Sequence, residues 1–389
     1  MNSDKRIKTK SPLKRHRIIW TVLRAFIRPV VRVMYRFSCE KLPVGKEPCL
    51  VLVNHTVNMD PLLVAAASKR QMYFVASDHV YRYGFWSKAL KWLVAPIPRT
   101  KGGSALSTVL AVKRAFAGGA SVCIFAEGNR TWDGITGPFP AGTASLARSG
   151  GVWLVTAVIE GGYLTQPRWA TTIRKGGARL VVRGKYSPEE LGAMTDGEVN
   201  ELISRDLYEN AFERNVSEKR VYKGKNRAEF LESLLFICPR CGQMSGLVSR
   251  EHTLRCTKCE SVWEFGTDGL LTGGHFSSLV DWNAWQKAEL FKRLDAGGVL
   301  TDEEGEVFEI VDGEEHLRDK GEVCLSAESF SVGHETFPIN SITGFSIFLK
   351  NTIAFSADRK SYVVKFPSKR FNALKYEYSV LHLSSRVKV

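Results

Sequence analysis

Short apolar runs recur between residues 49 and 183, and helix-like stretches separate several of them. The runs are residues 49–53, 72–76, 121–125, 152–159 and 179–183. Continuous apolar runs are typical of strands that are covered on both faces, and their alternation with helices favours a sheet between helical layers. The sequence therefore predicts an α/β domain with a largely buried sheet, which we assign to residues 41–222.

A helix and a charged stretch mark the end of this domain. Thr195 and Glu198 have the spacing of a capping box, in which each residue satisfies a backbone N–H group of the other. Residues 214–227 are rich in charge and resemble a linker. Because 389 residues are too many for one ordinary core, we expect further domains after this linker.

The first chemical motif, Asn54-His55-Thr56-Val57-Asn58-Met59-Asp60-Pro61, directly follows the first apolar run. We expect a strand-to-helix turn here, with Asp60 as the helix N-cap and Pro61 at the first helical position. Such a turn can bring the Asp60 carboxylate to one imidazole nitrogen of His55. Asp60 would then fix the tautomer while His55 takes a proton from a hydroxyl. An ordinary hydrogen-bonded turn is the more common explanation of such a pair taken alone.

The second motif, Phe125-Ala126-Glu127-Gly128-Asn129-Arg130-Thr131, follows the third apolar run. Gly128 permits a tight turn that presents Glu127 and Arg130 together. A guanidinium group suits bidentate phosphate recognition, and a third stretch, Ile97-Pro98-Arg99-Thr100-Lys101-Gly102, offers another arginine between the two motifs. A Glu–Arg salt bridge and a solvated basic turn are the alternative interpretations.

These blocks, in this order, resemble those of the glycerolipid acyltransferases, whose type member is 1-acyl-glycerol-3-phosphate acyltransferase. NHTVNMDP is similar to their NHxxxxD block, AEGNRT to their EGxR block, IPRTKG to an intervening block with a phosphate-binding arginine, and VTAVIEGGY to a fourth block. The four blocks cover about 110 residues. The resemblance implies that His55 and Asp60 are the catalytic pair. It also implies that Arg99, Glu127, Gly128 and Arg130 bind the glycerol phosphate of the acceptor.

The reaction implied by the resemblance moves a fatty acyl group from a thioester of coenzyme A or acyl carrier protein. The acceptor would be the sn-2 hydroxyl of 1-acyl-glycerol-3-phosphate, and the product phosphatidic acid in phospholipid biosynthesis. Two alternatives stay open: an acyltransferase that remodels another lysophospholipid, and a non-catalytic membrane-binding adaptor. The full set of charged motif residues disfavours the adaptor.

The N-terminal segment, residues 1–40, is basic and amphipathic. The chain has a net charge of +15, and this segment alone holds eleven Lys and Arg against Asp4 and Glu40. Residues 18–37 are apolar except for arginines at every fourth position, namely Arg24, Arg28, Arg32 and Arg36. One arginine at mid-membrane costs about 2.5–3.5 kcal/mol, so four of them favour a helix that lies in the membrane interface over a helix that spans.

We therefore predict that residues 1–40 associate with an anionic membrane, and that Pro29 kinks or divides their helix. A helix packed on the α/β domain and an arm that binds nucleic acid are the alternatives.

Cys238, Cys241, Cys256 and Cys259 form two CxxC pairs separated by fourteen residues. This spacing is typical of a zinc ribbon with a tetrahedral Cys₄ site, so we predict a structural Zn²⁺ within residues 223–270. A redox dithiol is the alternative. The other four cysteines are scattered, and no cleavable signal peptide is visible. We therefore expect a reducing compartment and the cytoplasmic face of a membrane.

The last part of the chain, residues 300–389, shows short β-like runs and then one helical stretch; residues 271–299 connect it to the zinc ribbon. This pattern resembles a pleckstrin-homology or GRAM-like module. Residues 345–389 carry nine Lys and Arg against Asp358 and Glu377, which suits an anionic lipid surface. A scaffold that packs on the enzyme is the alternative. The expected partners are membrane lipids, the lysophospholipid acceptor and acyl carrier protein, with no nucleic acid.

Overall fold

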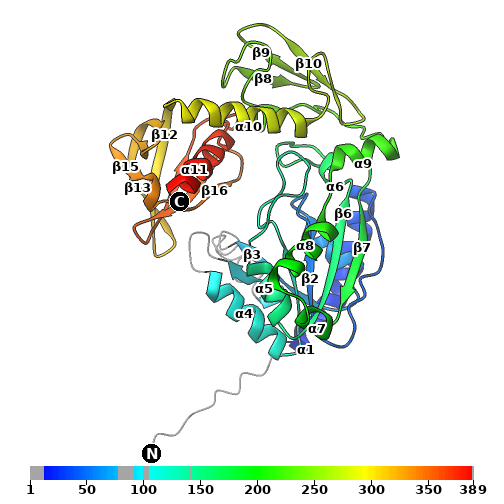
Figure 1. Ribbon diagram of the computed structural model, residues 1–389. Coiled ribbons are helices and arrows are strands. Elements are labelled where there is room, and N and C mark those ends of the chain that lie inside the picture. Colours follow the sequence, from blue (N-terminus) through cyan, green and yellow to red (C-terminus); the bar gives the residue numbers. More distant parts are fainter. Residues whose placement is uncertain (1–12, 78–91, 100–104, 141, 388–389) are drawn as a thin grey trace, which may run out of the picture.

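The computed structural model describes residues 13–77, 92–99, 105–140 and 142–387 (Figure 1). We name three parts: the α/β domain (residues 13–222), the cysteine module (residues 223–278) and the β domain (residues 300–387). Helix α10 (Leu279–Asp295) runs from the cysteine module to the β domain (Figure 1).

The α/β domain is built on a seven-stranded sheet in the order β1-β7-β6-β2-β5-β3-β4. The strands are β1 (Ser38–Cys39), β2 (Cys49–Val53), β3 (Met72–Ser77), β4 (Ile97–Arg99), β5 (Ser121–Phe125), β6 (Trp153–Glu160) and β7 (Arg179–Tyr186). All neighbours are parallel except β6 and β7. The five predicted strands are confirmed, whereas the short edge strands β1 and β4 were not predicted.

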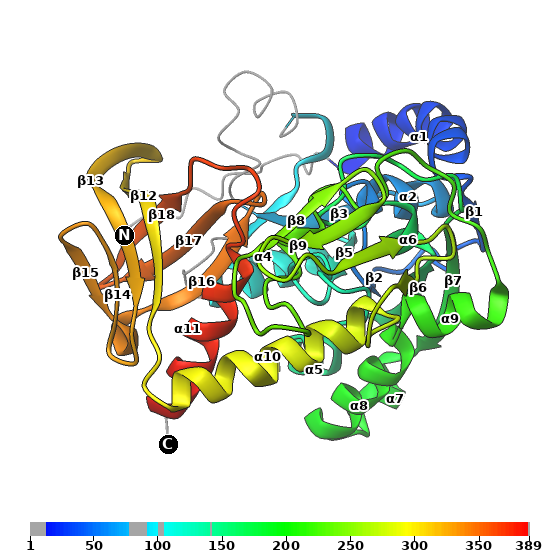
Figure 2. The same ribbon diagram turned by 90° about the horizontal axis from the view of Figure 1, so that it is seen from above.

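Helices cover both faces of this sheet (Figure 2). They are α1 (Leu13–Tyr35), α2 (Asp60–Ala67), α4 (Ala105–Ala117), α5 (Gly142–Ser149), α6 (Gly162–Thr165), α7 (Pro188–Gly192), α8 (Asp196–Leu207) and α9 (Ala211–Glu218). Strand β2 shows the two-sided burial, because Leu50 and Leu52 pack with α4, α5 and α8 while Val51 and Val53 pack with α1 and α2. The predicted capping box is present at the start of α8.

Helix α1 continues through Pro29, so the predicted division of this helix is wrong. One side of α1 packs on the α/β domain through Trp20, Val31 and Tyr35, and the Trp20 indole N–H donates to the Ser68 carbonyl at 3.2 Å. No helix in the described ranges is long and apolar enough to span a membrane.

The cysteine module contains a four-stranded antiparallel sheet in the order β11-β10-β9-β8. Its strands are β8 (Leu247–Arg250), β9 (Thr253–Cys256), β10 (Val262–Phe265) and β11 (Leu271–Thr272), preceded by the 3-10 helix η2 (Leu231–Ser233). The segment predicted as a connection, residues 271–299, includes the seventeen-residue helix α10.

The β domain contains a seven-stranded antiparallel sheet in the order β15-β14-β13-β12-β18-β17-β16. The strands are β12 (Leu300–Val311), β13 (Glu314–Leu325), β14 (Ser329–Val332), β15 (Glu335–Pro338), β16 (Thr343–Phe348), β17 (Thr352–Ala357) and β18 (Lys360–Lys365). The 3-10 helix η3 (Ile339–Ser341) follows β15, and α11 (Leu374–Val387) ends the chain. The predicted order of strands and then a helix is confirmed.

One hydrophobic core joins the three parts. It includes Trp132 and Trp169 of the α/β domain, Trp263 of the cysteine module, and Phe330 and Tyr376 of the β domain. The C-terminal parts are therefore packed against the α/β domain and are not tethered by a free linker.

Candidate active site and metal centre

His55 lies in the turn between β2 and α2, as predicted, and it is paired with Asp60. The His55 Nδ1 atom lies 2.7 Å from the Asp60 Oδ2 atom. Asp60 is fully buried, whereas a fifth of the His55 side chain is exposed. Within the described residues no hydrogen bond is made by His55 Nε2, so the pair presents one imidazole nitrogen to an incoming group. This geometry suits a general base.

Asp60 is not the N-cap of α2, which corrects our prediction. The N-cap is Met59, and Asp60 is the first residue of the helix. The Asp60 carboxylate turns back instead, and its Oδ2 atom accepts from the backbone N–H groups of Thr56 at 2.6 Å and Val57 at 2.9 Å. These bonds, with the Thr56 hydroxyl at 3.2 Å from Oδ1, hold the carboxylate against His55.

Glu127 binds the backbone that carries His55. Its Oε1 atom accepts from the His55 N–H at 2.7 Å, and its Oε2 atom accepts from the Gly137 N–H at 2.8 Å. Burial raises the pKa of Glu127 to about 8, although both N–H groups favour the carboxylate. The His55 carbonyl also accepts from the Thr131 N–H at 3.0 Å, so the two motif turns are joined on both sides of His55.

Gly128 makes room for Arg99. Its φ of +71° lies in the left-handed region, and a Cβ at this position would collide with the Arg99 guanidinium. Arg99, at the end of β4, therefore lies directly on the turn that carries Glu127 and Arg130. The pKa of Arg130 is lowered by burial, while the negative charge of Asp60 opposes this change. The structure thus brings the six predicted site residues together at one edge of the sheet.

Two aromatic residues at the site were not predicted. The Phe125 ring stacks on the His55 imidazole with 4.5 Å between ring centroids and helps to fix its orientation. Tyr35, the last residue of α1, donates to Gln166 Oε1 at 2.6 Å, and burial and the charge of Asp60 raise its pKa to about 12. Phe125 directly precedes a motif and could have been chosen from sequence, whereas Tyr35 had no such signal.

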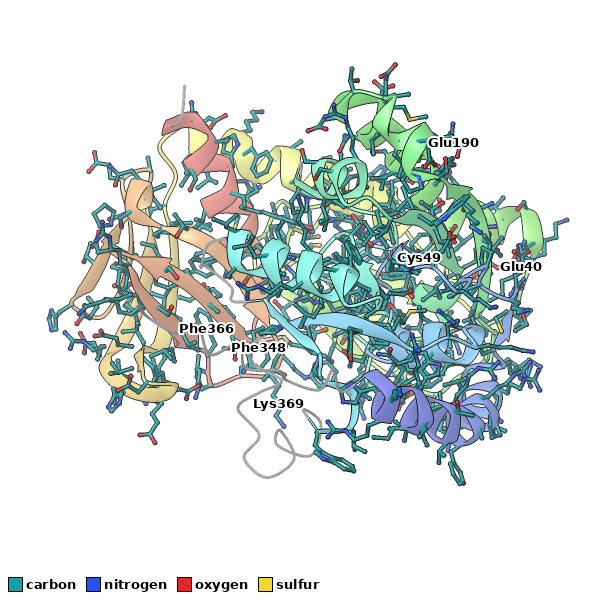
Figure 3. All side chains as sticks on the ribbon, turned by 90° about the horizontal axis from the view of Figure 1, so that it is seen from below. Glu40, Cys49, Glu190, Phe348, Phe366 and Lys369 are labelled. Carbon is teal, nitrogen blue, oxygen red and sulfur yellow. The ribbon has the colours of Figure 1, made fainter. Side chains whose placement is uncertain are left out.

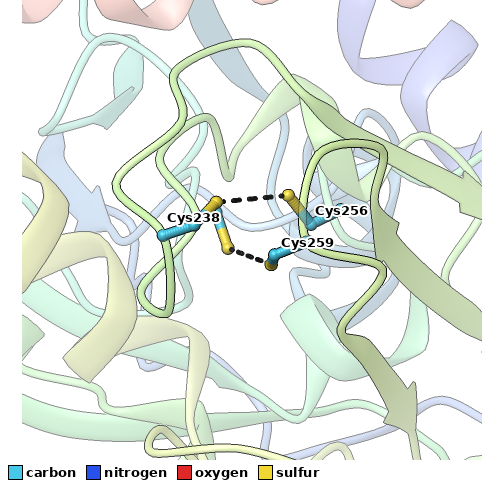
Figure 4. Close-up of side chains that lie close together, drawn as sticks. Cys238, Cys256 and Cys259 are labelled. Carbon is cyan, nitrogen blue, oxygen red and sulfur yellow. Dashed lines mark hydrogen bonds between the residues drawn. The ribbon is translucent and has the colours of Figure 1, made fainter.

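The four predicted metal ligands form a compact group (Figure 4). All four sulfur atoms lie within 4.8 Å of one another, and the Cys238–Cys259 and Cys241–Cys256 pairs are each 3.7 Å apart. Zn–S bonds of about 2.3 Å in a tetrahedron place the sulfur atoms about 3.8 Å apart, so these residues fit a zinc ion. The separation also exceeds an S–S bond length of about 2.05 Å, which agrees with four free thiols.

The sequence between α1 and the end of β6 was then compared with known families. Residues 34–160 match the Acyltransferase family model. This stretch contains His55, Asp60, Arg99, Glu127 and Arg130, and the match supports a glycerolipid-type acyltransferase domain in the chain. No curated protein matches the chain.

Among solved structures, the chain is similar to the 1-acyl-sn-glycerophosphate (LPA) acyltransferase PlsC from Thermotoga maritima. The two sequences are 17% identical, the TM-score is 0.43, and the alignment covers 54% of this chain and 84% of that chain.

Proposed function

We propose that this protein transfers a fatty acyl group from a thioester of coenzyme A or acyl carrier protein to the sn-2 hydroxyl of 1-acyl-glycerol-3-phosphate. The product is phosphatidic acid. The observation that carries the proposal is the His55–Asp60 pair, with Asp60 buried and His55 partly exposed beside Arg99 and Arg130.

In the proposed reaction, His55 Nε2 takes the proton of the acceptor hydroxyl while its oxygen attacks the thioester carbonyl. Asp60 holds the Nδ1 proton and stabilises the imidazolium that forms. The tetrahedral intermediate then expels the thiolate, and the proton on His55 Nε2 passes to that sulfur. The acceptor supplies the nucleophile, so no serine or cysteine of the chain is needed.

Arg99 and Arg130 are the proposed ligands of the acceptor phosphate. Glu127 has both carboxylate oxygens occupied by backbone N–H groups, so its proposed contribution is to hold His55 and the turn in place rather than to contact phosphate. Gly128 contributes by leaving space for Arg99.

The proposed location is a membrane surface on its cytoplasmic face. The side of α1 turned away from the α/β domain carries a stripe of exposed apolar side chains, namely Ile18, Val22, Phe26, Val30 and Val33. The arginines of α1 lie on an adjacent side of the helix because they occupy positions 24, 28, 32 and 36. An apolar stripe beside a cationic one is typical of a helix that lies in the lipid interface.

For the cysteine module we propose one structural Zn²⁺ held by Cys238, Cys241, Cys256 and Cys259. All four ligand positions are cysteines, so no position is left open for a substrate. The ion would hold together the two turns that begin this module.

The test is an acyl-transfer assay on the purified full chain. Acyl-CoA and acyl-ACP are each offered with a panel of lysophospholipids, and both free thiol and acylated lipid are measured. We expect transfer to 1-acyl-glycerol-3-phosphate, and a loss of about 10²–10⁴-fold in His55→Ala. Preferred transfer to another lysophospholipid would favour the remodelling alternative, and no transfer to any acceptor would favour the adaptor.

A further inference from the structure

Two cationic side chains outside the sequence motifs lie next to Arg130, and they connect it to the β domain. The first is Arg168, in the loop after α6, which is almost completely buried. Its guanidinium donates to the Arg130 carbonyl at 3.1 Å and to the Ile347 carbonyl of β16 at 2.8 Å. It also stacks on the Trp132 ring, 4.2 Å from the ring centroid. Arg168 therefore ties strand β16 to the turn that carries Arg130.

The second cation is Lys350, in the turn between β16 and β17. Figure 3 shows Phe348, at the end of β16, on the side of the β domain that faces the α/β domain. Two residues further on, the Lys350 ammonium donates to the carbonyl of Trp169, which is the neighbour of Arg168 in the chain. The ammonium also lies 4.1 Å from the centroid of the Phe230 ring.

Positive charge gathers here without a matching carboxylate. Burial lowers the pKa of Lys350 to about 8, and the charge of Arg130 lowers it further in the same direction. The acidic groups that act on Lys350, Glu229 and Glu232, are both ion-paired with Arg370. Across the described ranges, neither Arg130 nor Lys350 forms an ion pair with a carboxylate.

Like charges in a partly buried place repel one another, and a bound anion relieves that repulsion. An ammonium group has three donors, and Lys350 gives one of them to Trp169. Donors therefore remain on Lys350 for an anion that also contacts Arg130.

We propose that Lys350 is a third cation of the acceptor's phosphate site, supplied by the β domain, and that it selects a phosphomonoester over a phosphodiester. This proposal rests on the proposed function. A phosphomonoester carries about −1.5 to −2 charges at neutral pH and three free oxygens. A phosphodiester head group carries about one charge and two free oxygens, so a third cation adds little to its binding.

The test compares Lys350→Met, which keeps an apolar side chain on Phe230, with Lys350→Arg, which keeps the charge. The matched control is Lys369→Met, because Lys369 is exposed in the same domain. Steady-state kinetics are measured with 1-acyl-glycerol-3-phosphate and with a lysophosphodiester of the same acyl chain. The melting temperature of each variant is measured as a check of folding.

In Lys350→Met we expect the KM for the monoester to rise about 10- to 100-fold, the range for one lost charge-assisted hydrogen bond. The kcat and the KM for the diester should stay within about twofold of wild type, since one lost contact of the site is specific to the monoester. Lys350→Arg should recover most of the monoester affinity, and Lys369→Met should change neither KM. An equal rise for both acceptors, or no rise, would overturn the proposal for Lys350.

Absence of transfer to both acceptors by the wild-type chain would contradict the proposed function instead. Lys350 is then judged by direct binding of 1-acyl-glycerol-3-phosphate to the wild-type and Lys350→Met proteins. Weaker binding to the variant supports the Lys350 site without catalysis, and equal binding rejects it.

Discussion

Replacing Asp60 by Asn separates the charge of this residue from its hydrogen bonds. The Asn carbonyl oxygen can take the place of Oδ2 and accept from His55 Nδ1 and from the Thr56 and Val57 N–H groups. The opposite orientation of the amide would leave two buried N–H groups unpaired, at about 1–3 kcal/mol each. The His55 tautomer should therefore be kept, and the substitution removes mainly the negative charge.

The magnitude follows from the Coulomb energy of the pair. Two unit charges about 4 Å apart attract by about 4 kcal/mol at an effective dielectric constant of about 20. Losing this stabilisation of the imidazolium in the transition state corresponds to about 10³-fold in rate. Because the Thr56 and Val57 N–H groups already share the carboxylate charge, we expect kcat to fall by about 10²- to 10³-fold, with KM little changed.

The assay is steady-state acyl transfer, with thermal unfolding measured in parallel. The control is Asp206→Asn, since Asp206 is also buried and accepts from Thr156 and Tyr186 at 2.7 Å, with no contact to His55. We expect the two variants to lose comparable stability, and only Asp60→Asn to lose activity. Near-wild-type kcat in a folded Asp60→Asn protein would refute the role of the Asp60 charge.

Three further predictions concern the parts around the site. Zinc should copurify at about one ion per chain, and Cys238→Ser should lose the metal and lower the melting temperature, as elemental analysis and calorimetry would measure; metal-free protein with four titratable thiols would reject the site. Phe26→Ser with Val33→Ser should weaken sedimentation with anionic vesicles, since both side chains are exposed on α1, whereas Val248→Ser on the cysteine module should not; equal binding would mean that α1 only packs on the α/β domain. The KM for 1-acyl-glycerol-3-phosphate should rise as pH passes upward through about 8, because Lys350 then loses the charge that binds phosphate, and Lys350→Met should lack this rise; the same pH profile in both proteins would assign it to another group, with Arg130, Arg370, Glu229 and Glu232 nearest.

Local patterns predicted most of the secondary structure and the position of His55. The buried strands were visible because each is a continuous apolar run, and the capping box of Thr195 and Glu198 fixed the start of α8. Both signals depend on residues a few positions apart. The same is true of the turn that brings His55 to Asp60.

The start of α2 was predicted one position out because Asp60 can satisfy two sets of donors. As an N-cap it would accept from N–H groups that follow it, whereas it accepts from those of Thr56 and Val57, which precede it. The sequence contains both sets, and only the folded turn decides between them. A similar limit applies to α1, where the neighbours of Trp20 and Tyr35 decide that a helix with Pro29 at its centre continues.

Lys350 and Arg168 lie beyond any prediction from local pattern, because their partners are distant in the chain. Arg168 joins Arg130 to Ile347, and Lys350 contacts Trp169. Periodicity shows that a segment has an apolar face, but it does not show which other face will cover it. The sequence therefore predicted an α/β domain and two further modules without the contacts between them.

Those contacts give the cysteine module a connection to the active site. Trp132 and Trp169 lie in one core with Trp263 of the cysteine module, and the Tyr163 hydroxyl links them by donating to the Trp132 carbonyl at 2.8 Å and accepting from the Trp169 indole N–H at 3.1 Å. The same tryptophans support Arg168, which holds the turn of Arg130. Metal loss that loosens this core should therefore weaken phosphate binding before it affects proton transfer, because His55 is held separately by Asp60 and Glu127 in the α/β domain.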